Sequence, residues 1–246
     1  HPPPPTSSPS RAGGGAPPPP SCLDVGCGTG SFAISAAYFY QCRSTGIDFN
    51  EKVIARAKEN ALLLNLDCDF QTQDLFTWNP EEKFSIVSSQ GVLHHTYNCH
   101  AAVRKVLRDF VADGGYACIG LYHKYGRKPF LEHFQDLRKR GWDEEKLYTE
   151  YRRLNSRMKD ETRLRSWFRD QVLHPHETQH TLAEFTDIIT AEHCRLVSTS
   201  INRFAPIDDM ATILDMEADF ENIGRERLLQ GRYYPGYFVF LVQKKF

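Results

Sequence analysis

From residue 21 onward, two patterns of apolar residues alternate along the chain: short continuous runs, and residues that recur at helical spacing. Short apolar runs bounded by turn residues predict strands at 21–25, 44–49, 69–73, 84–89, 116–122, 196–201 and 237–243. Between these runs, apolar residues recur at helical spacing and predict helices at 31–40, 53–64, 101–111, 181–190 and 208–229. Strands that alternate with helices are typical of βαβ units around a mostly parallel sheet.

Residues 124–173 break this alternation and contain no convincing strand. Leu147, Tyr151, Leu154 and Met158 fall at i, i+4, i+7 and i+11, which predicts amphipathic helices. We therefore expect one α/β domain at 21–246, with a doubly wound seven-stranded sheet and a helical insertion at 124–178 after the fifth strand.

The first twenty residues differ in composition from everything that follows. They hold nine of the fourteen prolines, and no aliphatic side chain there is larger than that of Ala12. Polyproline II segments joined by a glycine run are expected, so residues 1–20 are predicted to be a disordered tail. A ligand for a proline-binding domain is the less favoured interpretation.

Charge and cysteine content exclude several functional classes. The 246 residues carry 30 Lys+Arg and 31 Asp+Glu, a formal net charge of −1, so the chain as a whole does not attract nucleic acid or an anionic membrane. No apolar run approaches the roughly 18 residues of a membrane helix, and no secretory signal is evident, which predicts a cytoplasmic protein without membrane insertion. The seven cysteines form no C-x-x-C pair, which disfavours a disulfide framework and a structural zinc site.

The sharpest motif is a glycine loop directly after the first predicted strand. The run Asp24-Val25-Gly26-Cys27-Gly28-Thr29-Gly30 joins that strand to a helix, so backbone N–H groups there are free to contact a ligand. A dinucleotide fingerprint would require glycine at position 31, where Ser31 stands. The loop predicts a nucleotide-like ligand other than a nicotinamide dinucleotide.

This run resembles motif I of the class I S-adenosylmethionine-dependent methyltransferases, and three later segments extend the resemblance. They are Asp48 at the end of the second strand, Asp74-Leu75 after the third, and Val92-Leu93-His94-His95 after the fourth. The resemblance implies a Rossmann-like sheet whose last strand is antiparallel. It also implies S-adenosylmethionine as cofactor and S-adenosylhomocysteine as product.

The resemblance assigns a cofactor-binding role to residues along four loops. The cradle would be formed by Asp24, Gly26, Cys27, Gly28 and Gly30. Asp48 would bind the ribose with Phe49 beside it, Asp74 the adenine with Leu75 beside the ring, and Gln90 the amino-acid end. Alternatively, Asp48 and Asp74 only cap the helices that follow them, and Gly26 only allows a tight turn.

Histidines supply the candidate catalytic and acceptor-binding groups. His94 or His95 would accept the acceptor's proton, unless both only shape the cofactor pocket. The acceptor would be contacted by His123, Lys124, Arg127, His174 and His176, under a lid formed by residues 124–178.

The sequence also leaves open a metal site and two other functions. His176 and His180 would share a helical face with Glu177 adjacent, but Pro175 favours a loop there, so no metal is predicted. We expect methyl transfer to a small or medium-sized acceptor. One alternative is an RNA methyltransferase, for which the local positive charge excess of residues 124–170 is relevant. The other is a cofactor-binding scaffold without turnover. The sequence does not indicate the identity of the acceptor or the oligomeric state.

Overall fold

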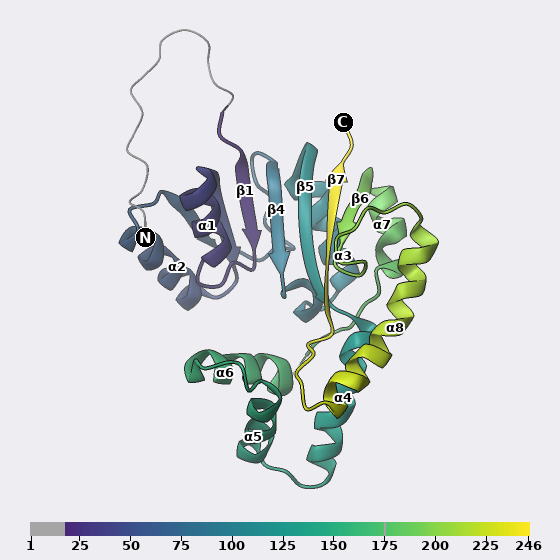
Figure 1. Ribbon diagram of the computed structural model, residues 1–246. Coiled ribbons are helices and arrows are strands. Elements are labelled where there is room, and N and C mark those ends of the chain that lie inside the picture. The colour runs from purple at the N-terminus through teal and green to yellow at the C-terminus, as the bar shows by residue number, and fades with distance from the viewer. Residues whose placement is uncertain (1–17, 175) are drawn as a thin grey trace.

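The computed structural model describes residues 18–174 and 176–246 as a seven-stranded sheet with helices on both faces (Figure 1). The strand order is β3-β2-β1-β4-β5-β7-β6. Their bounds are β1 Ser21–Val25, β2 Arg43–Asp48, β3 Cys68–Thr72, β4 Phe84–Gln90, β5 Val111–Tyr122, β6 Cys194–Thr199 and β7 Tyr237–Lys244. Neighbouring strands are parallel except that β7 pairs antiparallel with β5 and β6. The predicted fold class is therefore confirmed, whereas residues 1–17 of the expected tail lie outside the described residues.

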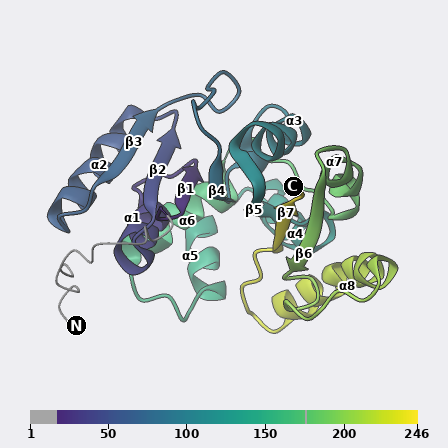
Figure 2. The ribbon, with the colours of Figure 1, turned by 90° about the horizontal axis from the view of Figure 1, so that it is seen from above.

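Helices on both faces explain how the central strands are buried. All five positions of β1 are buried, as expected for a parallel strand covered on both sides, whereas buried and partly buried positions alternate along β7. Figure 2 shows α1 on one side of the sheet and α3 and α7 on the other. The helices of the α/β part are α1 Ser31–Tyr40, α2 Glu51–Leu63, α3 Cys99–Lys105, α7 Thr186–Ala191 and α8 Met210–Leu229.

The segment after β5 is helical, as its periodicity predicts. It consists of α4 Lys124–Lys139, α5 Glu144–Leu154, α6 Glu161–Phe168 and the short η3 Arg169–Leu173. These helices bury a hydrophobic core of their own around Phe130, Phe134, Tyr151 and Phe168. Figure 1 shows α5 and α6 facing the carboxyl ends of β1 and β4, which is the edge where open α/β sheets bind ligands.

Several element boundaries differ from the sequence prediction. β5 begins at Val111, five residues earlier than expected, because Phe84 pairs with Val111 and Ile86 with Tyr116 across an irregular register. The helix expected at 181–190 is divided into η4 Ala183–Phe185 and α7. None of the helices in the described part of the chain is long and apolar enough to span a membrane. All seven cysteines lie within the described residues as free thiols.

Candidate functional site

The glycine loop between β1 and α1 depends on left-handed backbone conformations. Gly26, Gly28 and Gly30 have φ angles of 72°, 52° and 84°. A Cβ atom at Gly26 would lie 2.5 Å from Val92, and one at Gly30 would lie 2.6 Å from the ring of Phe70. A Cβ atom at Gly28 would meet nothing within 4 Å. A side chain at Gly28 would therefore project into open space, whereas one at Gly26 or Gly30 would collide with the protein.

Asp48, at the end of β2, is joined directly to this loop. Its Oδ2 accepts a hydrogen bond from the Gly28 backbone N–H at 3.1 Å, and its Oδ1 accepts one from Asn50 at 2.9 Å. Each carboxylate oxygen keeps a second lone pair for a further donor. The acidic group and the glycine loop, twenty positions apart, thus meet as the sequence analysis expects.

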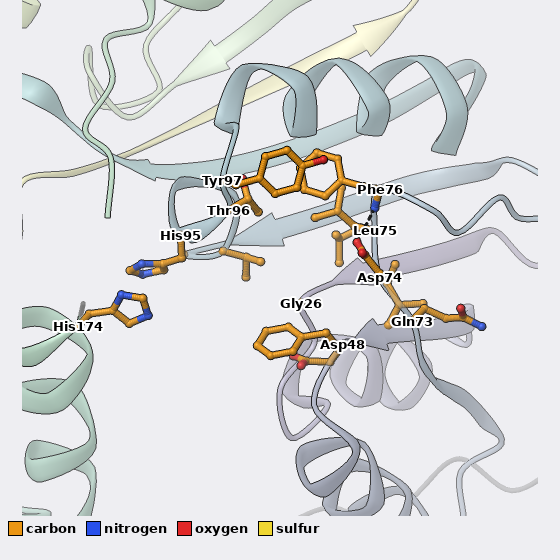
Figure 3. A pocket seen from close by; sticks show the side chains of 15 residues that line it. Gly26, Asp48, Gln73, Asp74, Leu75, Phe76, His95, Thr96, Tyr97 and His174 are labelled. Carbon is orange, nitrogen blue, oxygen red and sulfur yellow. Dashed lines mark hydrogen bonds between the residues drawn. The ribbon is translucent and has the colours of Figure 1, made fainter. Parts of the chain in front are cut away.

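A cavity of about 480 Å³ lies beside these two segments (Figure 3). Its volume is within the range of small-molecule sites, roughly 300–1,000 Å³. Figure 3 shows Asp48 and Asp74 on one side of the cavity and His95 and His174 on the other. The lining comes from the ends of β1, β2, β3 and β4 and from the insertion: Val25, Gly26, Ile47, Asp48, Phe49, Gln73, Asp74, Leu75, Phe76, Gly91, Val92, His95, Thr96, Tyr97 and His174.

Asp74 and Phe49 both line the cavity in the manner that their positions predict. Asp74 Oδ1 accepts a hydrogen bond from the Phe76 N–H at 2.8 Å, so the capping interpretation describes one of its oxygens. Its other oxygen has no partner in the described residues. Phe49 is 82% exposed, and its ring offers an apolar surface beside Asp48.

Five residues assigned to the cofactor site do not line the cavity: Asp24, Cys27, Gly28, Gly30 and Gln90. Asp24 is buried behind the glycine loop, and burial raises the pKa of its carboxyl to about 7. Burial also raises the pKa of the Cys27 thiol to about 12. Gln90 turns toward β5 and β7, where its side chain donates to the Cys118 carbonyl at 3.0 Å and accepts from the Tyr237 hydroxyl at 3.1 Å. The sequence predicts that Asp24, Cys27 and Gln90 contact the cofactor directly. This prediction is corrected, because the structure places all three beside the cavity, where they can only support it.

The structure separates the two adjacent histidines that the sequence left equivalent. His94 is fully buried, and its Nδ1 accepts a hydrogen bond from the Tyr122 N–H at 3.3 Å. Burial lowers the pKa of its imidazole to about 2. His94 is therefore neutral at neutral pH, with its proton on Nε2, and does not line the cavity.

His95 faces the cavity in the opposite tautomer. Its Nδ1–H donates to the carbonyl oxygen of His176 at 3.0 Å, which leaves the lone pair on Nε2. Burial lowers the pKa of His95, so its neutral form dominates at neutral pH. Nε2 accepts no hydrogen bond in the described residues and lies 3.6 Å from Asp170 Oδ1. The His95 ring lines the cavity, and its buried, unprotonated Nε2 lies beside the Asp170 carboxylate.

Two residues expected to contact the acceptor are instead buried structural groups. His123 caps α4, accepting from the Gly126 N–H at 3.2 Å, and its Nε2 lies 2.9 Å from Glu217. Arg127 is fully buried and donates to both oxygens of Glu177, at 3.0 and 2.8 Å. The prediction that His123 and Arg127 contact the acceptor is corrected, because both side chains are bonded to other residues of the protein and are closed to solvent.

The remaining predicted acceptor contacts divide between the cavity and its surroundings. His174 lines the cavity, and its ring centroid is 4.0 Å from that of His95. His176 turns away, with Nε2 3.2 Å from the Thr96 carbonyl. Lys124 is exposed, and its Nζ lies 4.0 Å from Glu184. His174 alone of these three is placed to touch a bound molecule.

Sequence reasoning missed Asp170 and Tyr122. Asp170 lies in η3, and its Oδ2 accepts a hydrogen bond from the Tyr122 hydroxyl at 3.2 Å while its Oδ1 faces His95. No motif spacing marks either residue, because the insertion that carries Asp170 reaches the site only through its tertiary packing. The aromatic pair Phe76 and Tyr97, 4.3 Å apart, was also missed, although both residues flank predicted site residues.

Comparison with known sequences identifies the family. A family described as "Methyltransferase domain" matches residues 20–172. A ribosomal protein L11 methyltransferase of Caldicellulosiruptor bescii is 35% identical over 95 residues, which are 37% of this chain and 31% of that protein. The chain spans about a quarter to a third of the length of the curated relatives it matches.

Solved structures share the fold at low sequence identity. PKMT2 from Rickettsia typhi in complex with AdoHcy aligns with a TM-score of 0.64 at 14% identity, over 91% of this chain and 48% of that one. Magnesium protoporphyrin IX methyltransferase from Synechocystis with bound SAH aligns with a TM-score of 0.55 at 16% identity, over 93% and 75%. Because the sequence identities are this low, the structural similarity shows a shared fold alone.

The residues present fit an adenosyl cofactor. Gly28 leaves open space where a ligand meets the backbone, and Asp48 and Asp74 offer acceptor oxygens along the same cavity. Ribose hydroxyls and an adenine amino group are donors that suit such oxygens. The family match covers more than half of the chain, and the sheet order and site agree with it. The chain therefore belongs to the methyltransferase domain family, and its fold is that of the class I S-adenosylmethionine-dependent methyltransferases.

Proposed function

We propose that this chain transfers the methyl group of S-adenosylmethionine to a small or medium-sized acceptor held between the cavity and the helical insertion. The observation that carries the proposal is the contact of Asp48 with Gly28, which places a carboxylate at the open point of the glycine loop. The cofactor supplies a methyl group already activated toward nucleophiles. The protein has to bind the cofactor and the acceptor and align the two. If the acceptor carries a proton on its reacting atom, the protein also has to remove that proton.

The cofactor would be held by three segments of the cavity. The backbone of Gly26, with Gly28 bonded to Asp48 beside it, would face its amino-acid end. Asp48 would accept from the ribose hydroxyls, and Asp74 would accept from the adenine amino group. Leu75 supplies an apolar side chain beside the ring. These roles follow from the position of each group along the cavity and from its acceptor capacity.

His95 is the residue best placed to remove the acceptor's proton. Its Nε2 keeps a lone pair, since Nδ1–H is held by the His176 carbonyl, and the residue lines the cavity. The acceptor's proton would pass to Nε2, and Asp170 at 3.6 Å would stabilise the imidazolium that forms. His94 cannot replace it, because its Nε2 already carries the proton.

A second cavity of about 280 Å³ supports an acceptor site under the insertion. It shares His174 with the first cavity and is otherwise lined by α4, η3 and the segment after η3. Its walls combine apolar side chains such as Phe130 and Phe134 with polar ones such as Gln171 and Gln179. We propose that the body of the acceptor lies here while its reacting atom reaches His95.

The charge distribution favours a small acceptor over a nucleic acid. Residues 124–170 contain fourteen Lys and Arg, but eight of these lie within ion-pair distance of a carboxylate: Lys124, Arg127, Lys128, Arg140, Lys146, Arg152, Arg153 and Arg165. A nucleic-acid interface requires basic groups available to neutralise phosphates. Local pairing removes much of that capacity.

Two measurements test the proposal in order. Calorimetric titration with S-adenosylhomocysteine should show micromolar or tighter binding, and a preference for a nicotinamide dinucleotide would contradict the cofactor assignment. A screen of small acceptors with S-adenosylmethionine, read as S-adenosylhomocysteine formed, then tests turnover. Cofactor binding without turnover on any small acceptor, RNA or protein would instead support the scaffold function.

A further inference from the structure

Two histidines and a glutamate from two segments of the chain converge on one point outside the cofactor cavity. His100 lies in the first turn of α3, His180 precedes η4, and Glu184 lies within η4. His180 Nδ1 is 2.8 Å and His100 Nε2 is 3.6 Å from the same oxygen, Glu184 Oε2. All three atoms lie within 4.8 Å of one another. We propose that they bind one Zn²⁺ ion, with a water molecule at the fourth position.

The two separations that involve Glu184 suit tetrahedral coordination. Zn²⁺ binds imidazole nitrogen and carboxylate oxygen at about 2.0–2.2 Å, so two ligand atoms in a tetrahedron lie roughly 3.3 Å apart. The distances of 2.8 and 3.6 Å to Glu184 Oε2 bracket that value. Two imidazoles and one carboxylate form a donor set that zinc accepts with a fourth position open to water.

Each ligand is held in place by bonds that do not involve the metal. The backbone of His180 donates to the Tyr122 carbonyl at 2.9 Å and accepts from the Lys124 N–H at 2.8 Å. The ring of His100 stacks on Phe185 at 5.1 Å, and Phe185 also contacts the ring of His180. Binding would therefore need only small side-chain movements.

The surroundings of His180 match those of a metal-bound imidazole. If Nδ1 faces the ion, Nε2–H donates to the Thr178 hydroxyl oxygen, which lies at 2.8 Å. Thr178 then donates its own proton to the His94 carbonyl at 3.0 Å. A hydrogen bond from the second ring nitrogen fixes the tautomer of most metal-bound histidines. Lys124 approaches the other oxygen, Glu184 Oε1, at 4.0 Å, so one carboxylate oxygen remains directed at both histidines.

The site would anchor the segment that positions the proposed base. Thr178, two residues before His180, donates both its N–H and its hydroxyl to the His94 carbonyl. His176 supplies the carbonyl that orients His95. An ion joining α3, His180 and η4 would brace this segment against the sheet, and binding to the folded state alone would raise the unfolding temperature.

Titration of the chelator-treated full chain with Zn²⁺ tests the site. We expect one ion per chain and an affinity at least about tenfold weaker in His100→Ala, since even loss of an outer-shell partner costs that much. His100 is exposed, so this variant should keep its fold, and its unfolding temperature without metal checks that. His133→Ala is the matched control, because His133 also pairs with a glutamate at 2.8 Å, but Arg153 occupies both oxygens of that Glu150.

The outcomes are distinct from those that test methyl transfer. Zn²⁺ affinity unchanged by His100→Ala and by Glu184→Gln, or no binding to the unaltered chain, would overturn the proposal and leave His180 and Glu184 as an ion pair only. A visible d–d absorption on Co²⁺ addition, lost in His100→Ala and kept in His133→Ala, would support it. S-adenosylhomocysteine titration of the same samples reports on the cofactor site independently.

Discussion

The imidazole rings of His95 and His174 lie 4.0 Å apart, although one follows β4 and the other ends the helical insertion. Both line the cofactor cavity, and His174 also lines the second cavity. This contact is where the sheet and the insertion meet around the space proposed for the reacting groups.

Replacing Asp48 by alanine should weaken S-adenosylhomocysteine binding by about 1–3 kcal/mol, because two hydroxyl donors of the ribose would lose a charged acceptor. Calorimetry of the variant and the unaltered chain measures the difference. Asp69→Ala is the control, since that exposed aspartate on β3 does not line the cavity. Equal affinity in all three proteins would remove Asp48 from the binding site.

Alanine at Gly28 and at Gly30 should have different consequences. Both residues have positive φ, which costs an alanine about 1–2 kcal/mol of folding free energy. At Gly30 the added methyl also meets Phe70 at 2.6 Å, so Gly30→Ala should be the less stable protein in urea unfolding. Gly28→Ala should fold but bind S-adenosylhomocysteine more weakly, and unchanged binding would argue that the cofactor does not approach that point.

His95→Gln should reduce turnover by about 10²–10⁴-fold for an acceptor that must lose a proton, because general base catalysis is lost. S-adenosylhomocysteine affinity should change little. His94→Gln provides the comparison, and we expect it to lower the unfolding temperature while retaining most turnover per folded molecule. Equal losses of turnover in the two variants would mean that His95 has no special role.

Burial of His94 should make the fold sensitive to acid. Its pKa is lowered from 6.5 to about 2, so the unfolded chain binds a proton that the folded chain refuses. Its contribution to stability is fully present above pH 6.5 and decreases as pH falls from 6.5 toward 2, at up to about 1.4 kcal/mol per pH unit. Urea unfolding of His94→Gln at pH 7.5, 6 and 5 should show a shallower loss than the unaltered chain, and parallel curves would contradict the assignment.

The contribution of Asp24 to stability should depend on pH in the opposite direction to that of His94. Burial raises its pKa from 3.8 to about 7, so the folded chain binds the proton more tightly than the unfolded chain. Its contribution is fully present below pH 3.8 and is lost as pH rises through 7. The stability of Asp24→Asn relative to the unaltered chain should therefore increase between pH 5 and 8. A difference independent of pH would mean that Asp24 titrates near its ordinary pKa.

The meeting of Asp48 with the glycine loop could be predicted from the sequence. Parallel strands in a βαβ unit end at the same edge of the sheet, and β1 and β2 pair in register from Ser21 and Arg43 onward. The end of each strand is visible as a change from apolar to turn residues. Local patterning and a general rule of topology are therefore sufficient for this part of the site.

The roles of His94 and His95 could not be separated in that way. Both lie in η1 Leu93–His95, where successive side chains point about 120° apart, so one faces the interior and the other the cavity. Which one does so depends on how the turn docks against Tyr122. The burial of Arg127 and the approach of Asp170 to His95 likewise depend on how the insertion packs. No pattern of residue spacing in the sequence predicts that packing.

The amino-acid sequence by itself determined the order of strands and helices, the glycine loop and the acidic residues at its edge, because hydrophobic period and turn chemistry act over a few neighbouring residues. Only the tertiary structure decided which histidine carries a free lone pair and which charged groups of the insertion are closed off by pairing. Those properties arise from contacts between segments such as Asp170 with His95 and Arg127 with Glu177. Burial and hydrogen bonding set proton affinity, and both are known only when distant segments have been brought together.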